Sequence, residues 1–408
     1  MFARRAAWDL TPNPLSERVA ARRKLGLPVL DLSDANPTHA GLAAPAEALA
    51  LALGELARDA AALRYDADPR GEPAVRAAVA ACHPRAAPDD VVLTAGTSEG
   101  YAHLFRLLAD PGDRVHVPTP GYPLFEHLAL LEGLDVARYR LRPPPPGAGA
   151  RWRIDLDSLA ATLSPRTRAV LVIHPHNPTG SFVDRDDLAA LRALGRARGF
   201  ALVSDEVFAE TGPSGAPPGA LVGAEQGPLH FVLSGASKLL ALPQLKVAWI
   251  AVGGPARERA EALARLEFVA DAYLSVSPLL ASLLPRLLAQ REGIRRELRE
   301  RVAANRTQLE AALAGRAGIE CLPAEAGWSA IVRVAVGEAT PPDDEDLALA
   351  LLDRAGVLVQ PGFLFDLEGE PERPAAHLVL CLLSEPEAFG EGARALARGL
   401  AEEPCRKS

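Results

Sequence analysis

The chain has 408 residues, of which 49% are hydrophobic and 24% are charged, and its formal net charge is −8. This length predicts a large domain with a smaller one, and the composition is that of an ordinary globular protein. The acidic balance speaks against a nucleic-acid-binding protein, because such proteins use a basic surface to neutralise phosphates.

Segments that would indicate export, membrane insertion or metal binding are not expected. No apolar run reaches the roughly 18–20 residues that span a bilayer, and no long apolar core follows the N-terminal arginines. The four cysteines, Cys82, Cys321, Cys381 and Cys405, show no CxxC spacing that would predict a zinc site or a disulfide framework. We therefore expect a reduced, cytoplasmic protein without metal and without a membrane partner.

Short apolar runs alternate with amphipathic stretches over residues 90–255. The predicted strands are Val91–Ala95, Arg114–Val117, Val136–Leu141, Ala169–His174, Ala201–Ser204, His230–Ser234 and Val247–Val252. The predicted helices are Glu99–Ala109, Tyr122–Glu132, Asp184–Arg198 and Arg257–Ala270. Such alternation predicts an α/β domain with a mainly parallel, buried sheet of seven strands.

The texture of the sequence changes in its C-terminal third. Residues 278–315 are helical and charged in pattern, and a mixture of short strands and helices follows. The predicted strands lie near 329–335, 357–359 and 377–383, and the predicted helices near 343–355 and 386–402. We expect an N-terminal segment (1–44) that packs with a small α+β domain (276–408), and a large domain (45–275).

A turn of small residues joins the first predicted strand to the helix after it. Gly96 lets the backbone approach a ligand closely, and Thr97 and Ser98 then open the helix, whose free amides favour an anion such as phosphate. Thr and Ser are also common helix caps, so this turn alone does not establish a phosphate site.

Asn177 lies in the turn His174–Gly180, which contains two prolines and follows the strand Ala169–His174. In open α/β sheets, ligands bind at the carboxyl ends of strands, where Asn177 would offer an amide donor. An Asx turn that caps its own backbone remains the alternative.

Asp205 and Glu206 end the next strand. A buried carboxylate is costly unless it is paired, and a cationic ring nitrogen would be a suitable partner for Asp205. Asp205 could also serve only as a helix cap.

Lys238 follows small residues, Ser234 to Ser237, at the end of another buried strand. A lysine in such a place can lose its proton and form a Schiff base, although an ordinary surface lysine is the alternative. Lys246 adds a second positive charge close by. Together the phosphate-type turn, the amide, the acid and the lysine fit one ligand with a phosphate, a phenolic oxygen, a ring nitrogen and an aldehyde.

These motifs resemble the class I/II aminotransferases of the fold-type I pyridoxal-phosphate enzymes. The resemblance covers nearly the whole chain, from Asn36-Pro37-Thr38 through Tyr65 and Gly71 to Gln360-Pro361-Gly362. It implies a large domain with a seven-stranded sheet between helices and a smaller α+β domain. It also implies the cofactor pyridoxal 5′-phosphate and, in the active form, a homodimer.

The resemblance also assigns roles to residues. Lys238 would hold the cofactor as a Schiff base and move the substrate proton, and Asp205 would keep the ring nitrogen protonated. Asn177 would donate to the ring oxygen, and Tyr122 would stack on the ring. The remaining cofactor-binding residues would hold the phosphate: Gly96, Thr97, Ser98, Ser237, Lys246 and, from the partner subunit, Tyr65.

The sequence departs from the family pattern at three positions. Phe208 stands where many relatives carry a tyrosine that donates to the ring oxygen, and Lys246 stands where many carry arginine. Val379 stands where the arginine that binds the substrate carboxylate usually lies, and no arginine occurs between His377 and Gly390. Residues 271–273 offer no arginine for a second carboxylate, which disfavours an aspartate-specific enzyme.

We therefore predict an aminotransferase that moves an amino group from an amino acid or amine to a 2-oxo acid in two half-reactions. A lyase, decarboxylase or synthase is the alternative on the same fold, because the cofactor supports all of these reactions. A non-catalytic pyridoxal-phosphate sensor is a third interpretation, but no additional partner domain is visible in the sequence.

Overall fold

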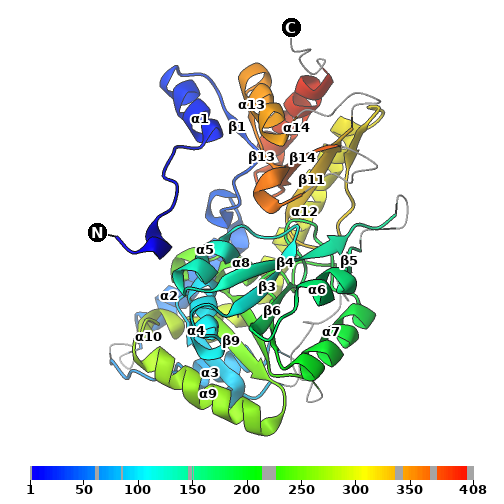
Figure 1. The fold of residues 1–408 in the computed structure, drawn as a ribbon. Helices are drawn as coiled ribbons and strands as arrows, with labels where there is room; N and C mark the ends of the chain where they lie inside the picture. Colours follow the sequence, from blue (N-terminus) through cyan, green and yellow to red (C-terminus); the bar gives the residue numbers. More distant parts are fainter. Residues whose placement is uncertain are drawn as a thin grey trace.

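The computed structural model describes residues 2–59, 64–83, 86–145, 149, 151–213, 227–335, 343–367 and 375–401. The described residues form two layered bodies, with the large sheet in the lower half of Figure 1 and the C-terminal elements above it. The proline-rich run at Pro143–Pro146 and the loop at 211–219, both expected as connections, lie partly outside the described residues.

The large sheet has eight strands in the order β2-β9-β8-β7-β6-β3-β4-β5. The strands are β2 (Val91–Thr94), β3 (Arg114–Thr119), β4 (Asp135–Arg142), β5 (Arg153–Ile154), β6 (Thr167–Ile173), β7 (Ala201–Asp205), β8 (His230–Gly235) and β9 (Ala248–Gly253). The neighbours from β8 to β4 pair in parallel, whereas β9 runs antiparallel to both β8 and β2. Six of the strands therefore point their carboxyl ends to one edge, and the loops that carry the candidate residues gather there.

The predicted fold class is confirmed, with one addition to the sheet. All seven predicted strands are present, and β5 is an eighth, antiparallel to the end of β4. The addition escaped prediction because β5 has only two residues and therefore shows no hydrophobic periodicity.

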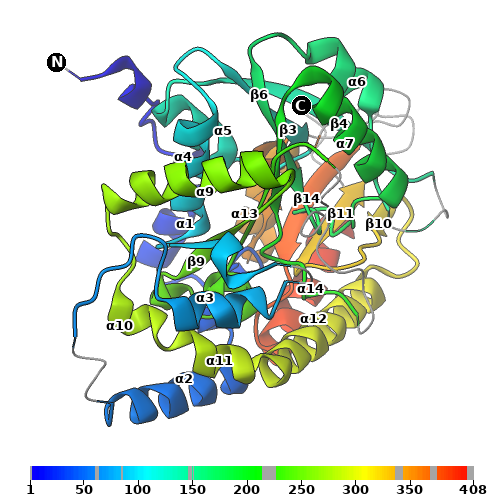
Figure 2. The ribbon, with the colours of Figure 1, turned by 90° about the horizontal axis from the view of Figure 1, so that it is seen from below.

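Helices cover both faces of this sheet, as expected for strands that are apolar on both sides. Alternate residues of one strand enter different cores: Leu171 packs with α4 (Thr97–Leu108), α5 (Leu124–Leu131) and α9 (Ala256–Asp271). Val170 and Val172 pack with α6 (Leu156–Thr162) and α7 (Arg185–Arg198) on the opposite face. Figures 1 and 2 show α7 and α9 on opposite sides of the sheet.

The C-terminal body contains a four-stranded antiparallel sheet in the order β10-β11-β14-β13. Its strands are β10 (Ile319–Cys321), β11 (Ser329–Val334), β13 (Gln360–Pro361) and β14 (Ala376–Cys381), with helices α13 (Asp344–Ala355) and α14 (Pro386–Ala401). The strand predicted near 357–359 corresponds to β12 (Val357–Leu358), which pairs with β1 (Leu30–Asp31) and not with this sheet. The next strand along the chain, β13, belongs to the sheet.

The first residues of the chain lie beside these C-terminal elements. Leu15 and Val19 of α1 (Pro14–Lys24), with Leu32, enter the core formed with α13 and α14. Figure 1 shows the same arrangement, with α1 in blue next to α13 in orange. These contacts agree with the expected packing of the N-terminal segment, and the domain limits at residues 44 and 275 stay a prediction.

Further helices complete the two bodies, and most of them are visible in the view of Figure 2. They are α2 (Ala43–Leu56), α3 (Pro73–Ala80), α8 (Ala236–Leu239), α10 (Pro278–Ala281), α11 (Leu284–Ala289) and α12 (Arg291–Leu313), with 3-10 turns at Arg4–Ala6, Pro37–His39, Pro88–Asp90, Pro243–Leu245 and Gly362–Phe365. In the part of the chain that the structure describes, none of the helices combines the length and the apolar character that crossing a membrane requires.

Candidate active site

The turn between β2 and α4 forms one corner of the site. Gly96 precedes the first residue of α4, and no side chain caps the amides of this helix end. A Cβ atom on Gly96 would lie 3.2 Å from Lys246 Nζ, so the glycine leaves space directly beside an ammonium group. With Thr97 and Ser98 in the first turn of α4, this corner combines free amides, the helix dipole and a cation, which suits an anion.

Lys246 reaches this corner from an unusual backbone conformation. It ends the 3-10 turn Pro243–Leu245 and has a φ of 51°, in the left-handed region that residues other than glycine seldom adopt. The conformation places the lysine beside Gly96, although the two lie in different loops.

Asp205 ends β7 and is buried. The Tyr101 hydroxyl donates to its Oδ2 over 2.9 Å, and the Val207 amide donates to its Oδ1 over 3.2 Å. Burial raises the pKa of Asp205, while these donors and Lys238 act in the opposite direction. No ion pair between described residues includes Asp205. A cationic group of a ligand would therefore be a favourable partner for this buried carboxylate.

Lys238 lies in α8, directly after β8. Burial lowers the pKa of its amine, which favours the neutral, nucleophilic form. Its Nζ lies 4.9 Å from the centre of the Trp328 ring and 5.9 Å from that of Phe208. Ser237 precedes Lys238 and is partly buried in the same turn.

Asn177 joins the two bodies of the molecule. It follows β6, and its Oδ1 accepts a hydrogen bond from Ser329 Oγ of β11 over 3.0 Å. The Asx turn considered from the sequence would direct this oxygen to the backbone of the asparagine's own loop, but the hydroxyl of a distant strand occupies it instead. The Asn177 amide group is then left to donate toward the site.

The two tyrosines predicted from the resemblance are placed differently. Tyr122 lies between β3 and α5 and is 43% exposed; partial burial, and secondarily the nearby Asp205 carboxylate, raise the pKa of Tyr122. Tyr65 is 71% exposed between α2 and α3 and forms no hydrogen bond with the described residues of its own chain. The structure therefore brings Tyr122 to the other candidates and leaves Tyr65 at the surface.

The sequence matches the family described as aminotransferase class I and II over residues 28–375. The chain belongs to this family. Arginine–pyruvate transaminase AruH of Pseudomonas aeruginosa is 30% identical over 97% of this chain and 95% of its own length. S-alkyl-thiohydroximate lyase SUR1 of Arabidopsis thaliana is 34% identical, but that match covers 41% of this chain and only 35% of the lyase.

Solved structures support the same fold. Alanine aminotransferase from Pyrococcus furiosus superposes with a TM-score of 0.82 over 99% of this chain and 100% of its own, at 23% identity. The predicted family, the aminotransferase activity and the pyridoxal-phosphate cofactor are confirmed, and lyase, synthase or sensor functions are not favoured.

The residues present in this aminotransferase fit its cofactor. The buried Asp205 suits a protonated ring nitrogen, the buried Lys238 amine suits an aldehyde, and the corner between Gly96 and Lys246 suits a phosphate. All three features are observed in the structure of this chain and do not depend on the comparison with its relatives. Within the described residues, no group of three or more His, Cys, Asp or Glu side chains could hold a metal ion.

Four residues of this site were missed from the sequence. Tyr101 holds Asp205, Trp328 and Cys381 lie beside Lys238, and Ser329 holds Asn177. Only Tyr101 carried a signal, because it lies one helical turn after Thr97 and so lies on the same side of α4. The other three lie in the C-terminal body, and their approach to Lys238 and Asn177 depends on how the two bodies pack.

Proposed function

We propose that this aminotransferase moves an amino group from an amino acid or amine to a 2-oxo acid in two successive half-reactions, as a cytoplasmic homodimer. The observation that carries the proposal is the placement of a buried acid, a buried amine and an anion corner at one edge of one sheet. Pyridoxal phosphate supplies an aldehyde that captures amines and a ring that stabilises negative charge on the amino-bearing carbon.

Each residue then has a defined task. Lys238 Nζ takes the proton from the amino-bearing carbon of the substrate and later returns it, as its lowered pKa allows. Asp205 binds the ring nitrogen and keeps it protonated, and Tyr101 keeps Asp205 in place. Asn177 donates to the ring oxygen, and Tyr122 covers the ring.

The phosphate group is held by the corner described above. The amides of Thr97 and Ser98, the Lys246 ammonium and the Ser237 hydroxyl bind it around the space left by Gly96. Lysine offers a single point charge here, so this clamp lacks the paired geometry that arginine would give.

The homodimer is supported by the surface of the chain. Exposed apolar side chains occur on α2, near the end of α9 and in the segment after it: Leu51, Leu53, Phe268, Tyr273, Leu274 and Leu279. Apolar surface of this kind fits a second copy, which would also bring the exposed Tyr65 to the partner's phosphate corner. Size-exclusion chromatography with light scattering measures the mass, and a monomer at micromolar concentration would contradict this part of the proposal.

The visible spectrum of purified protein tests the function. We expect an absorption band that depends on Lys238, changes when an amino donor is added and returns when a 2-oxo acid follows. Lys238→Ala should lose the covalent band, whereas Lys24→Ala, on the exposed helix α1, should keep it. A band that no amine or amino acid changes, or a change without return, would contradict amino transfer.

A further inference from the structure

The strands β11 and β14 present one face to the active site. Side chains alternate along a strand, so residues two apart share a face. Ala330, Val332, Leu378 and Leu380 enter the core of the C-terminal body. Ser329, Ile331, Val379 and Cys381 therefore point to the opposite side, toward the large body, and they form two cross-strand pairs: Ser329 with Cys381, and Ile331 with Val379.

The first of these pairs marks where the reacting atoms lie. Ser329 donates to Asn177, and Cys381 lies close enough to Lys238 for the two groups to influence each other electrostatically. The second pair follows directly along the strands. A group attached to the reacting carbon of a substrate, on the side away from Lys238, would therefore extend toward Ile331 and Val379.

This second pair belongs to an apolar wall. Ile331 and Val379 cluster with Phe365 and Leu367, and all four side chains are buried. The side chains of Trp152, Leu322 and Leu364 pack against the cluster. A carboxylate placed here would lose its water and gain no charged partner, which is unfavourable.

The arginines around this wall are already engaged. Arg138 pairs with Glu126 and Asp366, and Arg151 pairs with Glu325. Arg306 donates to the backbone oxygens of Leu322 and Ser329. Arg333 follows Ile331 on the same face, but two residues along a strand correspond to a displacement of about 7 Å. Among the described residues, a carboxylate on the reacting carbon would therefore find no uncommitted arginine beside Ile331 and Val379.

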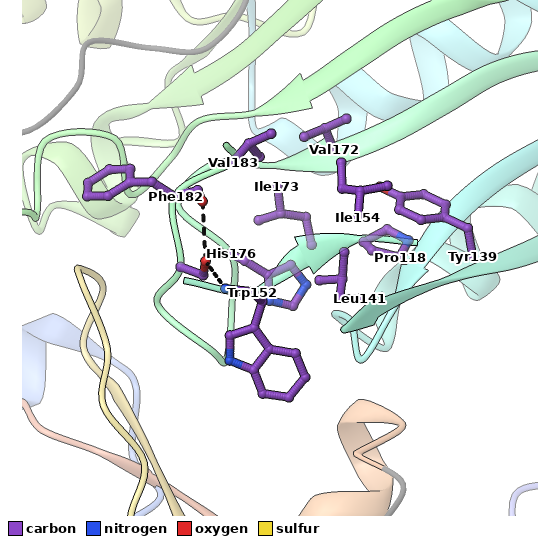
Figure 3. A pocket seen from close by; sticks show the side chains of 11 residues that line it. Pro118, Tyr139, Leu141, Trp152, Ile154, Val172, Ile173, His176, Phe182 and Val183 are labelled. Atoms are coloured by element: carbon purple, nitrogen blue, oxygen red, sulfur yellow. Dashed lines mark hydrogen bonds between the residues drawn. The ribbon is translucent and has the colours of Figure 1, made fainter. Parts of the chain in front are cut away.

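The apolar character continues behind Trp152. The indole ring also borders a cavity of about 20 Å³, whose other walls include Leu141, Ile154 and Ile173. Figure 3 shows Trp152 among the side chains that line this cavity, with His176 beside it. The side of the indole that faces this cavity is mostly apolar, although His176 and Ser181 also line the cavity.

We propose that the amino donor of this enzyme is a primary amine that carries an apolar group, and no carboxylate, on its reacting carbon. This inference rests on the proposed function. In the overall reaction, R–CH2–NH2 loses two electrons and its nitrogen and becomes R–CHO with an oxygen from water. The 2-oxo acid takes up the nitrogen and the two electrons and releases its carbonyl oxygen as water, so that atoms and electrons balance. Because the 2-oxo acid meets the same wall, it saturates the enzyme only at high concentration.

Pentylamine and L-norleucine provide the test, because they differ only by the carboxylate on the reacting carbon. With the purified holoenzyme, the half-saturating concentration for the spectral change is measured for each. We expect pentylamine to be favoured by about 100-fold, the factor that corresponds to the loss of a hydrogen bond to a charged group. Val379→Arg should reverse this order, and Val379→Ile, which keeps the wall apolar, should preserve it.

The wild-type comparison decides the inference even if the arginine variant does not fold. The inference is overturned if norleucine saturates at the same or a lower concentration than pentylamine, or if neither compound changes the band. If norleucine converts the Lys238-dependent band at the same or a lower concentration than pentylamine, the proposed function stays intact and only the substrate class is removed. Loss of the band itself, or no response to any donor, would remove both.

Discussion

Tyr101→Phe tests the donor that holds Asp205. The Tyr101 hydroxyl lies 2.9 Å from Asp205 Oδ2, and both side chains are buried. A hydrogen bond to a charged acceptor contributes about 1.5–3 kcal/mol. We expect the variant to raise the pKa of Asp205 further, in addition to the increase that burial already causes.

The direction of the pH dependence follows from this increase. A carboxyl group whose pKa is raised by folding contributes stability below its unfolded pKa, and this contribution is lost as the pH rises through the folded-state pKa. Since Tyr101→Phe raises the folded-state pKa of Asp205 further, it enlarges the loss at high pH. The variant without cofactor should lose up to about 1.5–3 kcal/mol more, relative to wild type, at pH 8 than at pH 5.

Urea unfolding at the two pH values measures this difference, and Tyr139→Phe is the matched control. The Tyr139 hydroxyl is also buried, but it donates to the backbone oxygen of Leu171 over 2.7 Å, and that oxygen does not titrate. The control should therefore lose the same free energy of unfolding at both pH values. If both variants show the same pH dependence, the assignment of Tyr101 as the donor that stabilises ionised Asp205 is wrong.

Three further substitutions test other parts of the site. Gly96→Ala places a methyl group 3.2 Å from Lys246 Nζ and should weaken cofactor binding about tenfold or more, as measured by fluorescence titration. The control Gly54→Ala, whose Cβ meets open space, should leave cofactor binding unchanged. Trp328→Ala removes a buried side chain that is 2% exposed and should lower the free energy of unfolding by about 3–5 kcal/mol; a loss under 1 kcal/mol would argue against its place in the core. Phe208→Tyr adds a donor near the cofactor and should lower the pKa at which the visible band titrates, so an unchanged or higher value would refute that role.

Much of the large domain could be predicted because its strands are apolar on both faces. The runs at Val91, Ala169 and His230 end in small or polar residues, and the structure places strands at each of them. The reversed direction of β9 could not be read from its residues, because a buried strand has the same composition whichever way it runs. The direction follows instead from the short connection that includes α8 and Lys238, which turns the chain back on itself.

The residues of the candidate site also fall into two groups, those that a local sequence pattern predicts and those that depend on distant contacts. Gly96, Asp205 and Lys238 were predictable because each lies within a few residues of a strand end in a recognisable local pattern. Ser329 and Trp328 were not, because their neighbours in the sequence say nothing about contacts with Asn177 and Lys238, which lie far away along the chain. Contacts between the two bodies depend on long-range packing, and a local pattern cannot encode their pairing partner.

At Lys246, which has a left-handed backbone, selection for stability and selection for cofactor binding favour different residues. Holding a residue other than glycine in this conformation costs about 1–2 kcal/mol, which glycine would avoid. A library screened for the thermal stability of the cofactor-free protein should therefore enrich glycine or asparagine at this position. The same library screened with the cofactor bound should retain lysine, because only the ammonium reaches the space beside Gly96. The residue at position 246 thus indicates whether cofactor binding or only folding has been selected.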